Sequence, residues 1–199
     1  MLQGRHLVLV KVIARVTALL PLLRLVWLGF ADGLGADPVK FVIHSTGTWA
    51  LAILLVTLGI TPLRRLTGIS WPQQLRRMCG LFAFFYACLH LLGYVWLDQW
   101  FDWQSMAKDI AKHPRMLVGF VAFFLMIPLA VTSTNAMMRL LKRRWQVLHR
   151  LVYVIAVLGV LHFLWLVKKD ISEPLIYAAV LSVWLGIRLL WAIRAGVRV

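Results

Sequence analysis

Residues 75–97 read LRRMCGLFAFFYACLHLLGYVWL, a long run of apolar side chains with two arginines near its start and a histidine, His90, inside it. A helix needs about 20 mostly apolar residues to cross the hydrocarbon core of a bilayer. This segment has that length, so it is predicted to span a membrane. Ionisable groups are costly at such a depth and often mark a functional site, which makes His90 the first residue of interest.

Five further segments have the same character, which gives six candidate membrane helices at residues 11–30, 41–60, 75–97, 116–131, 147–167 and 174–191. Short connections with turn chemistry, such as Asp37-Pro38 and Glu173-Pro174, separate several of them. Of the 199 residues, 62% are hydrophobic and 15% charged. A soluble domain is about half apolar and about a quarter charged. The sequence therefore predicts an all-α bundle of six transmembrane helices, formed as a single domain by residues 1–199.

The charged residues separate between the two sides of this predicted bundle. The connections after the second and fourth segments are basic, with Arg64, Arg65, Arg76 and Arg77 in one and Arg139, Lys142, Arg143, Arg144 and Arg150 in the other. All seven acidic residues fall on the opposite side: Asp32, Asp37, Asp98, Asp102, Asp109, Asp170 and Glu173. Because basic loops favour the cytoplasm, both termini are predicted to be cytoplasmic (N-in/C-in). The net charge of +15 then indicates topology and contact with anionic membrane lipid, and no nucleic acid partner is expected.

Four histidines lie inside the predicted helices: His44, His90, His149 and His162. Successive helices run in opposite directions, so the depth of a residue follows from its position at about 1.5 Å per residue. This estimate puts the first, second and fourth of these histidines at one depth near the outer side. His149 is then about 20 Å further in.

Two of these histidines suit heme b, which needs one or two imidazole ligands from facing helices and apolar walls. His90 and His162 are predicted to be the axial ligands of the heme iron. Zinc is less apt, because no acidic or cysteine ligand lies near that depth. A proton relay is an alternative role for intramembrane histidines, although the helices contain no acidic residue to complete it.

Three other residues are candidates for supporting roles at the cofactor. His149 is predicted either to ligate a second, inner heme or to contact a flavin, a quinone or a propionate. The position fourteen residues before His90 is Arg76, which is no iron ligand, so an inner heme would lack a second histidine. His44 is a candidate heme-edge residue or alternative ligand, and Arg24 is a candidate propionate partner.

Smaller features of the chain carry weaker expectations. Gly80 and Gly93 flank His90 and leave room either for a porphyrin or, as we favour, for close packing of helices. Residues 98–115, with several tryptophans before and within them, are expected to hold a short interfacial helix. Residues 132–135, Thr-Ser-Thr-Asn, are expected to cap another short helix.

An ordered set of motifs resembles the ferric-reductase-like transmembrane group and, within it, the MsrQ family of heme-binding membrane subunits. The motifs are GLGADPV at 33–39, HSTG at 44–47, ITPL at 60–63, LHL at 89–91, TST at 132–134, RWQVLH at 144–149 and HF at 162–163. The resemblance spans nearly the whole chain, and it implies that His90, His149 and His162 correspond to the heme ligands of the group.

The resemblance also implies a function. It implies one or two b-type hemes and an association with FMN, in a multi-pass protein of the bacterial inner membrane. Electrons would come from the quinone pool or from a cytoplasmic flavin reductase, because the chain has no GxGxxG motif of its own. They would pass to a periplasmic molybdopterin enzyme, MsrP, which reduces methionine sulfoxide in oxidised proteins. The alternatives are a heme-binding ferric reductase and a non-redox transporter or assembly factor.

Overall fold

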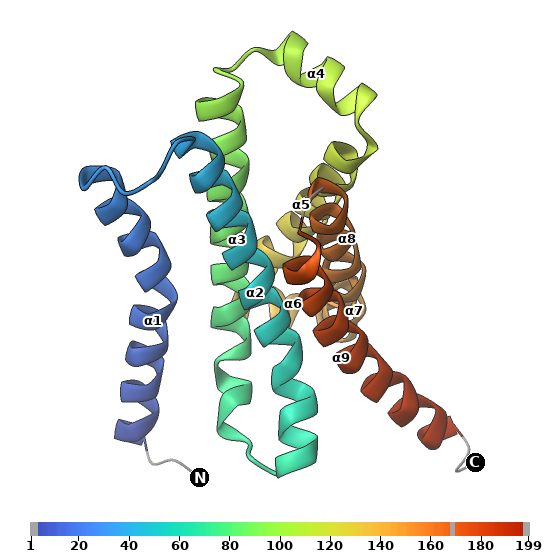
Figure 1. Ribbon diagram of the computed structural model, residues 1–199. Coiled ribbons are helices and arrows are strands. Elements are labelled where there is room, and N and C mark those ends of the chain that lie inside the picture. The colour runs from blue at the N-terminus through green and yellow to red at the C-terminus, as the bar shows by residue number, and fades with distance from the viewer. Residues whose placement is uncertain (1–3, 168–169, 197–199) are drawn as a thin grey trace.

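The computed structural model describes residues 4–167 and 170–196, and within these ranges the chain is helical and has no β-strand (Figure 1). The α-helices are α1 (Gly4–Phe30), α2 (Pro38–Thr67), α3 (Arg76–Leu92), α4 (Trp103–Lys112), α5 (Pro114–Val131), α6 (Asn135–Leu141), α7 (Arg143–Leu148), α8 (Leu151–Leu166) and α9 (Ser172–Gly196). A 3-10 turn, η1 (Trp71–Gln74), precedes α3, and a π-helical turn, η2 (Gly93–Asp98), continues it.

Six stretches of helix are long and apolar enough to cross a membrane: His6–Phe30, Pro38–Thr67, Arg76–Asp98, Pro114–Val131, Arg143–Leu166 and Ser172–Arg194. Together they contain nearly all of the six predicted segments. Large apolar side chains also face outward, including Trp27, Phe30 and Leu189. The predicted all-α bundle of six membrane helices is therefore confirmed, and the chain is a multi-pass membrane protein.

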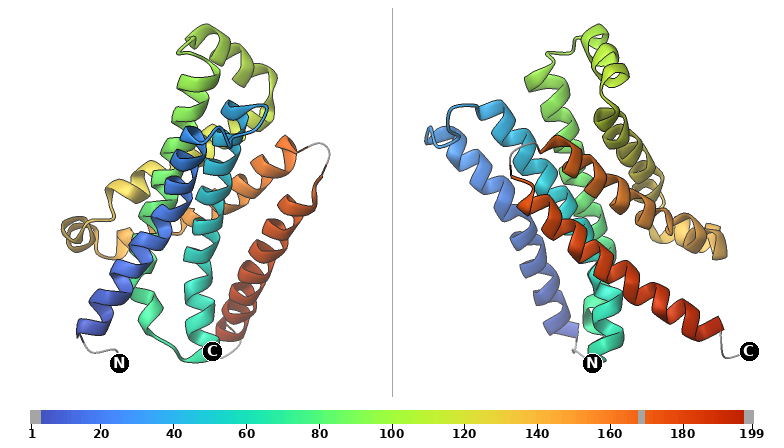
Figure 2. Two further views of the ribbon diagram at one scale, coloured as in Figure 1. Left: turned by 60° about the vertical axis from the view of Figure 1, so that its left-hand side comes forward. Right: turned by 45° about the vertical axis from the view of Figure 1, so that its right-hand side comes forward.

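The centre of the bundle is made of two helix pairs. α2 packs along α3, α5 packs along α8, and α9 lies against both α2 and α8. Figures 1 and 2 show α1 at the edge of the bundle, with α4 at the end opposite the two termini. We call the α4 end the upper end and the end with the termini the lower end. The buried core lies where the pairs meet and is formed by Leu51, Leu54, Leu55, Leu58, Ala83, Val152, Ile155, Ala156, Val160, Phe163 and Leu181.

A side chain from α9 satisfies a carbonyl group that a proline leaves unpaired in α2. Pro62 has no N–H to donate to the carbonyl of Leu58. Arg188 Nη2 donates to that carbonyl over 2.7 Å, and Nη1 donates to the Tyr153 hydroxyl of α8 over 2.9 Å. One guanidinium group therefore joins α2, α8 and α9 in the lower half of the bundle.

A hydroxyl group attaches α1 to the bundle. Tyr86 of α3 is fully buried, and its hydroxyl donates to the carbonyl of Ala18 over 2.7 Å and accepts from the N–H of Leu22 over 3.2 Å. Those two backbone groups would bond to each other in a regular α-helix. The tyrosine hydroxyl is thus inserted into the ladder of α1 beside Pro21, where helices commonly bend.

Both expected short helices are present. The helix within residues 98–115 is α4, and the Asp102 carboxylate caps it by accepting from the N–H groups of Gln104 and Ser105. The helix after residues 132–135 is α6, where the Thr134 hydroxyl accepts from the N–H of Met137. The fifth predicted segment is interrupted, because α7 ends at Leu148 and α8 begins at Leu151. His149 lies in that break.

Candidate functional site

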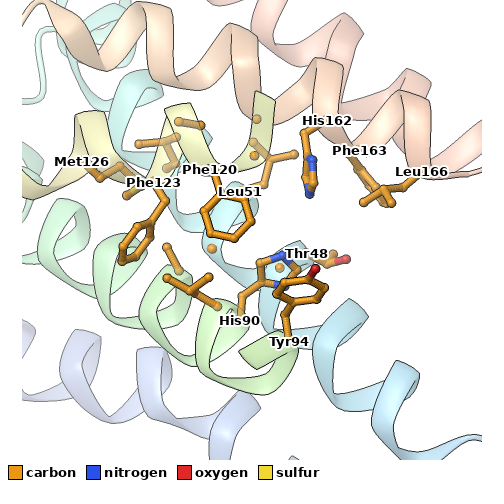
Figure 3. Close-up of a pocket in the computed structure, with 18 of the residues that line it drawn as sticks. Thr48, Leu51, His90, Tyr94, Phe120, Phe123, Met126, His162, Phe163 and Leu166 are labelled. Carbon is orange, nitrogen blue, oxygen red and sulfur yellow. The ribbon is translucent and has the colours of Figure 1, made fainter. Parts of the chain in front are cut away.

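An apolar cavity lies between the α2–α3 pair and the α5–α8 pair (Figure 3). Its walls include Leu51, Leu54, Ala87, Leu91, Phe120, Phe123, Met126, Ile155, Phe163 and Leu166. His90 enters from α3 and His162 from α8, and Figure 3 shows the two imidazoles pointing toward each other across the space. The structure thus brings together the two residues predicted as axial ligands.

The separation of the two rings suits one metal ion between them. The ring centroids of His90 and His162 are 6.2 Å apart, and the ring planes make an angle of 82°. An imidazole nitrogen binds a transition metal at about 2 Å, so two rings on opposite sides of one ion have centroids about 6 Å apart. The observed pair fits this geometry without movement of either helix.

Each imidazole is oriented by a backbone carbonyl. His90 Nδ1 lies 2.8 Å from the oxygen of Ile43 on α2, and His162 Nδ1 lies 2.7 Å from the oxygen of Arg115 at the start of α5. A carbonyl only accepts, so each Nδ1 carries the proton and each Nε2 keeps its lone pair. Metal-binding histidines usually have this second hydrogen bond, which fixes both the tautomer and the ring orientation.

Two glycines make room for the rings. A Cβ at Gly47 of α2 would lie 2.8 Å from His90 Nδ1, and one at Gly119 of α5 would lie 2.6 Å from His162 Cε1. Real Cβ atoms do not approach so closely, so any other residue at these positions would displace an imidazole. Neither glycine was predicted to contact a histidine. Their positions in membrane helices, close in depth to the predicted ligands, were the signal that could have found them.

The glycines selected from sequence have another role. A Cβ at Gly93 would lie 3.1 Å from Ile43 Cγ1, which confirms that this glycine serves close packing between the end of α3 and α2. A Cβ at Gly80 would make ordinary contact with Thr57 at 3.8 Å. Neither glycine lines the cavity between the histidines.

The small number of possible protein ligands favours a metal that is already coordinated by a macrocycle. Within the described ranges, no cluster of three or more His, Cys, Asp and Glu side chains is placed to hold a metal ion. A zinc site takes at least three such ligands from the protein. The iron of a porphyrin has four macrocycle nitrogens and needs only axial ligands, so the pair at His90 and His162 fits heme better than zinc.

His44 and Arg24 lie toward the upper end of this site. His44 lines the apolar cavity and packs edge-to-face on Phe163, with ring centroids 5.5 Å apart. It also lines a second, outer cavity, together with Arg24, Lys40 and Thr48. The Thr48 hydroxyl is shared between the two cavities and is buried without a hydrogen-bond partner in the described structure. His44 and Thr48 therefore stand between the apolar cavity and the outer cavity.

His149 lies apart from the other three histidines, in a larger cavity toward the lower end. Its ring stacks on Trp145 with centroids 3.9 Å apart, and Nε2 lies 3.1 Å from the Thr132 hydroxyl. That hydroxyl donates to the Pro128 carbonyl over 2.6 Å, so it accepts a hydrogen bond from His149 Nε2–H. No second histidine is among the described residues that line this lower cavity.

The lower cavity is more polar than the upper one and has basic residues in its lining. Its lining includes Gln73, Gln74, Arg76, Arg77, Ser133 and Asn135. Leu54, Met126 and Ile155 line both cavities and therefore stand between them. The two predicted depths of the membrane histidines correspond to these two cavities.

Together, the fold and the site define a class: a multi-pass helical membrane protein with two histidines that face each other across an apolar cavity. The model of the ferric reductase like transmembrane component family matches residues 46–160. By this match and by the relatives described next, the chain belongs to the ferric reductase like transmembrane family and, within it, to the MsrQ heme-binding subunits.

Several curated relatives carry the name protein-methionine-sulfoxide reductase heme-binding subunit MsrQ. The one from Ralstonia nicotianae is 55% identical over 98% of this chain and 92% of its own length. The one from Herminiimonas arsenicoxydans is 51% identical over 94% of this chain and 87% of its own length. The one from Xanthomonas euvesicatoria is 55% identical over 82% of this chain and 75% of its own length. No solved structure gives a significant match.

Proposed function

We propose that the chain, acting as a single domain, binds heme b between His90 and His162 and carries electrons to a periplasmic methionine sulfoxide reductase. The observation that carries this proposal is the facing pair of imidazoles, with centroids 6.2 Å apart and both Nδ1 atoms bonded to carbonyls. The printed names of the relatives, heme-binding subunits of a methionine sulfoxide reductase, support it.

The chemistry divides between the cofactor and the chain. Bound heme supplies a one-electron couple at its iron, whose potential depends on its axial ligands and surroundings. His90 and His162 would hold the iron through Nε2, and the carbonyls of Ile43 and Arg115 keep the rings oriented. The apolar walls exclude water, which lowers the dielectric around the iron and so raises the energy of any unneutralised charge there.

We assign the carboxylate edge of the macrocycle to the outer cavity. Carboxylates are costly in an apolar space, and the lining that joins the two cavities is polar at His44 and Thr48. Arg24 supplies a positive charge to the lining of the outer cavity, which also contains the Lys40–Asp37 ion pair and Glu173. His44 is thus proposed as a heme-edge residue rather than an iron ligand, with Arg24 as a propionate partner.

The lower cavity is proposed as the place where electrons enter. His149, Arg76 and Arg77 line it, and it is separated from the upper cavity by apolar side chains. A quinone, an FMN or a second heme at this position would meet both an imidazole and cationic groups. The donor is then the quinone pool or a cytoplasmic flavin reductase, with MsrP as the periplasmic acceptor and the bacterial inner membrane as the location.

The histidine pair is tested by its spectrum. Protein purified from heme-replete cells should show the absorption bands of a b-type cytochrome on reduction, and His90→Ala or His162→Ala should lose most of the bound heme. His113→Ala, which changes a histidine outside the membrane helices, is the matched control. Full heme content in both ligand variants would refute the assigned pair, and colourless wild-type protein would favour a transporter or an assembly factor.

Direct ferric reduction is the second candidate, because the matching family is described as ferric reductase like. The two functions differ in the acceptor. Reduced, heme-loaded protein should transfer electrons to a purified periplasmic molybdopterin reductase and leave ferric chelates largely oxidised. The reverse preference would favour the ferric reductase.

A further inference from the structure

A groove separates the first half of α1 from the start of α3, at the lower end of the bundle. Lys11 and Arg15 line it from α1. The opposite wall is formed by Met78, Leu81, Phe82 and Phe85 of α3, with Gln74 and Arg77 at the lower end, and the groove has a volume of about 490 Å³. It shares no residue with the cavity between His90 and His162. It shares Gln74, Arg77 and Leu81 with the lower cavity, from which its α1 wall and Phe82 and Phe85 distinguish it.

The groove exists because α1 is attached to α3 at one level only. In the described part of the chain, the hydrogen bonds between these helices are both made by the Tyr86 hydroxyl, at Ala18 and Leu22. From Ala18 back to Lys11, α1 continues for about 10 Å, at 1.5 Å per residue, without such an attachment. Figures 1 and 2 show α1 running along the outside of the bundle over this length.

Positive charge gathers at the lower end of the groove. Lys11, Arg15 and Arg77 line it, while residues 4–31 and 70–92, which form its walls, contain no Asp or Glu. Arg77 Nη1 donates to the side-chain oxygen of Asn135, which is a neutral group. Within the described ranges the ion pairs are Lys40–Asp37 and His113–Asp109, so these three cations have no acidic partner there.

The upper part of the groove is apolar. Leu81 is 40% exposed and Phe85 is 37% exposed, although both lie on a helix that is otherwise packed against α2. Phe82 and Phe85 pack edge-to-face, with ring centroids 6.4 Å apart, and so form a continuous apolar wall. A basic end and an apolar wall of this kind complement a negatively charged headgroup followed by an acyl chain.

We propose that this groove binds one anionic diacyl phospholipid. The phosphate lies at Lys11 and Arg15, and one acyl chain runs along Leu81, Phe82 and Phe85 toward the Tyr86 attachment. Basic pockets between helices at the cytoplasmic side of a membrane commonly bind such headgroups. The lipid fills the space that α1 leaves open, and it neutralises cations that the protein itself does not pair.

Native mass spectrometry of the purified, heme-loaded protein tests the site. The probes are phosphatidylglycerol and phosphatidylethanolamine with identical acyl chains. Wild-type protein should retain one phosphatidylglycerol in preference to phosphatidylethanolamine. The double variant Lys11→Gln with Arg15→Gln should bind it more weakly, by about fivefold for each charge removed. Inorganic phosphate at the same concentration should not displace the lipid.

A matched charge control and a steric variant complete the experiment. Arg139→Gln with Arg143→Gln removes the same charge from exposed positions that do not line the groove, and should leave lipid binding unchanged. Met78→Trp keeps every cation but fills the apolar wall at a residue that does not line the lower cavity, and should also lose the lipid. Equal binding of both lipids, equal loss in the control, or displacement by phosphate would overturn the proposal. A normal elution volume and thermal melt identify folded variants independently of heme.

Discussion

His90, His162 and His149 differ in which ring nitrogen the protein uses. The first two donate from Nδ1 to a backbone carbonyl and keep Nε2 for a metal. The third has Nε2 bonded to the Thr132 hydroxyl and its ring face covered by Trp145. To ligate iron through Nε2, His149 would have to give up that hydrogen bond. The Nε2 atoms of the upper pair are therefore free to bind the proposed iron, whereas Nε2 of His149 is occupied by a hydrogen bond.

Gly119→Ala tests how strictly the pair is positioned. The added Cβ would lie 2.6 Å from His162 Cε1, so the imidazole must move away from the line between the two rings. Losing the orientation of a metal-binding histidine commonly weakens the metal by about 10- to 100-fold, and we expect heme affinity to fall within that range. Heme titration of the apoprotein, followed by Soret absorbance, measures it.

The matched control is Gly186→Ala in α9, where an added Cβ meets no atom within 4 Å. It should bind heme as the wild type does. If Gly119→Ala also kept wild-type heme affinity and spectrum, the His162 imidazole would be able to move and still bind heme. The close contact between Gly119 and His162 would then not matter for the cofactor.

At the scale of the helices, the sequence predicted the six membrane segments, which depend on composition. It did not predict the contacts that side chains make between helices. The six segments were predictable because an apolar run of membrane length has few other uses. The bond from Arg188 to the Leu58 carbonyl was not predicted, because it depends on how α9 crosses α2, which no local pattern specifies. Gly47 and Gly119 were missed for the same reason, since the neighbour that needs the space is on another helix.

The Arg188 contact predicts a double-variant effect. Arg188→Leu leaves the Leu58 carbonyl without a donor, and an unsatisfied buried acceptor costs about 1–3 kcal/mol. Pro62→Ala restores a backbone N–H that can reach that carbonyl. The destabilisation by Arg188→Leu should therefore be smaller in the Pro62→Ala background than alone. Thermal unfolding of all four proteins in one detergent measures this coupling.

Arg194→Leu, at an exposed position in the last turn of α9, controls for the loss of a basic residue. It should lower the melting temperature less than Arg188→Leu and show no dependence on Pro62. Additive effects of Arg188→Leu and Pro62→Ala would mean that the guanidinium does not replace the missing N–H, whatever the size of each effect.

At the scale of the whole molecule, the two cavities lie at different depths along the membrane normal. The histidine pair is nearer the upper end, where acidic residues cluster around α4, and His149 is nearer the basic lower end. Basic loops favour the cytoplasm because their translocation is disfavoured. With this orientation, the proposed route would carry an electron from the lower cavity to a site close to the periplasm.

Cysteine labelling in intact cells tests that orientation. Ser70→Cys, between α2 and η1, and Gln104→Cys, in α4, are exposed and lie at opposite ends of the bundle. In a background that lacks the native Cys79 and Cys88, a thiol reagent that cannot cross the inner membrane should label Gln104→Cys. It should label Ser70→Cys only after the cells are lysed. The opposite pattern would put the histidine pair near the cytoplasm, where it could not serve a periplasmic reductase directly, and would favour a cytoplasmic acceptor instead.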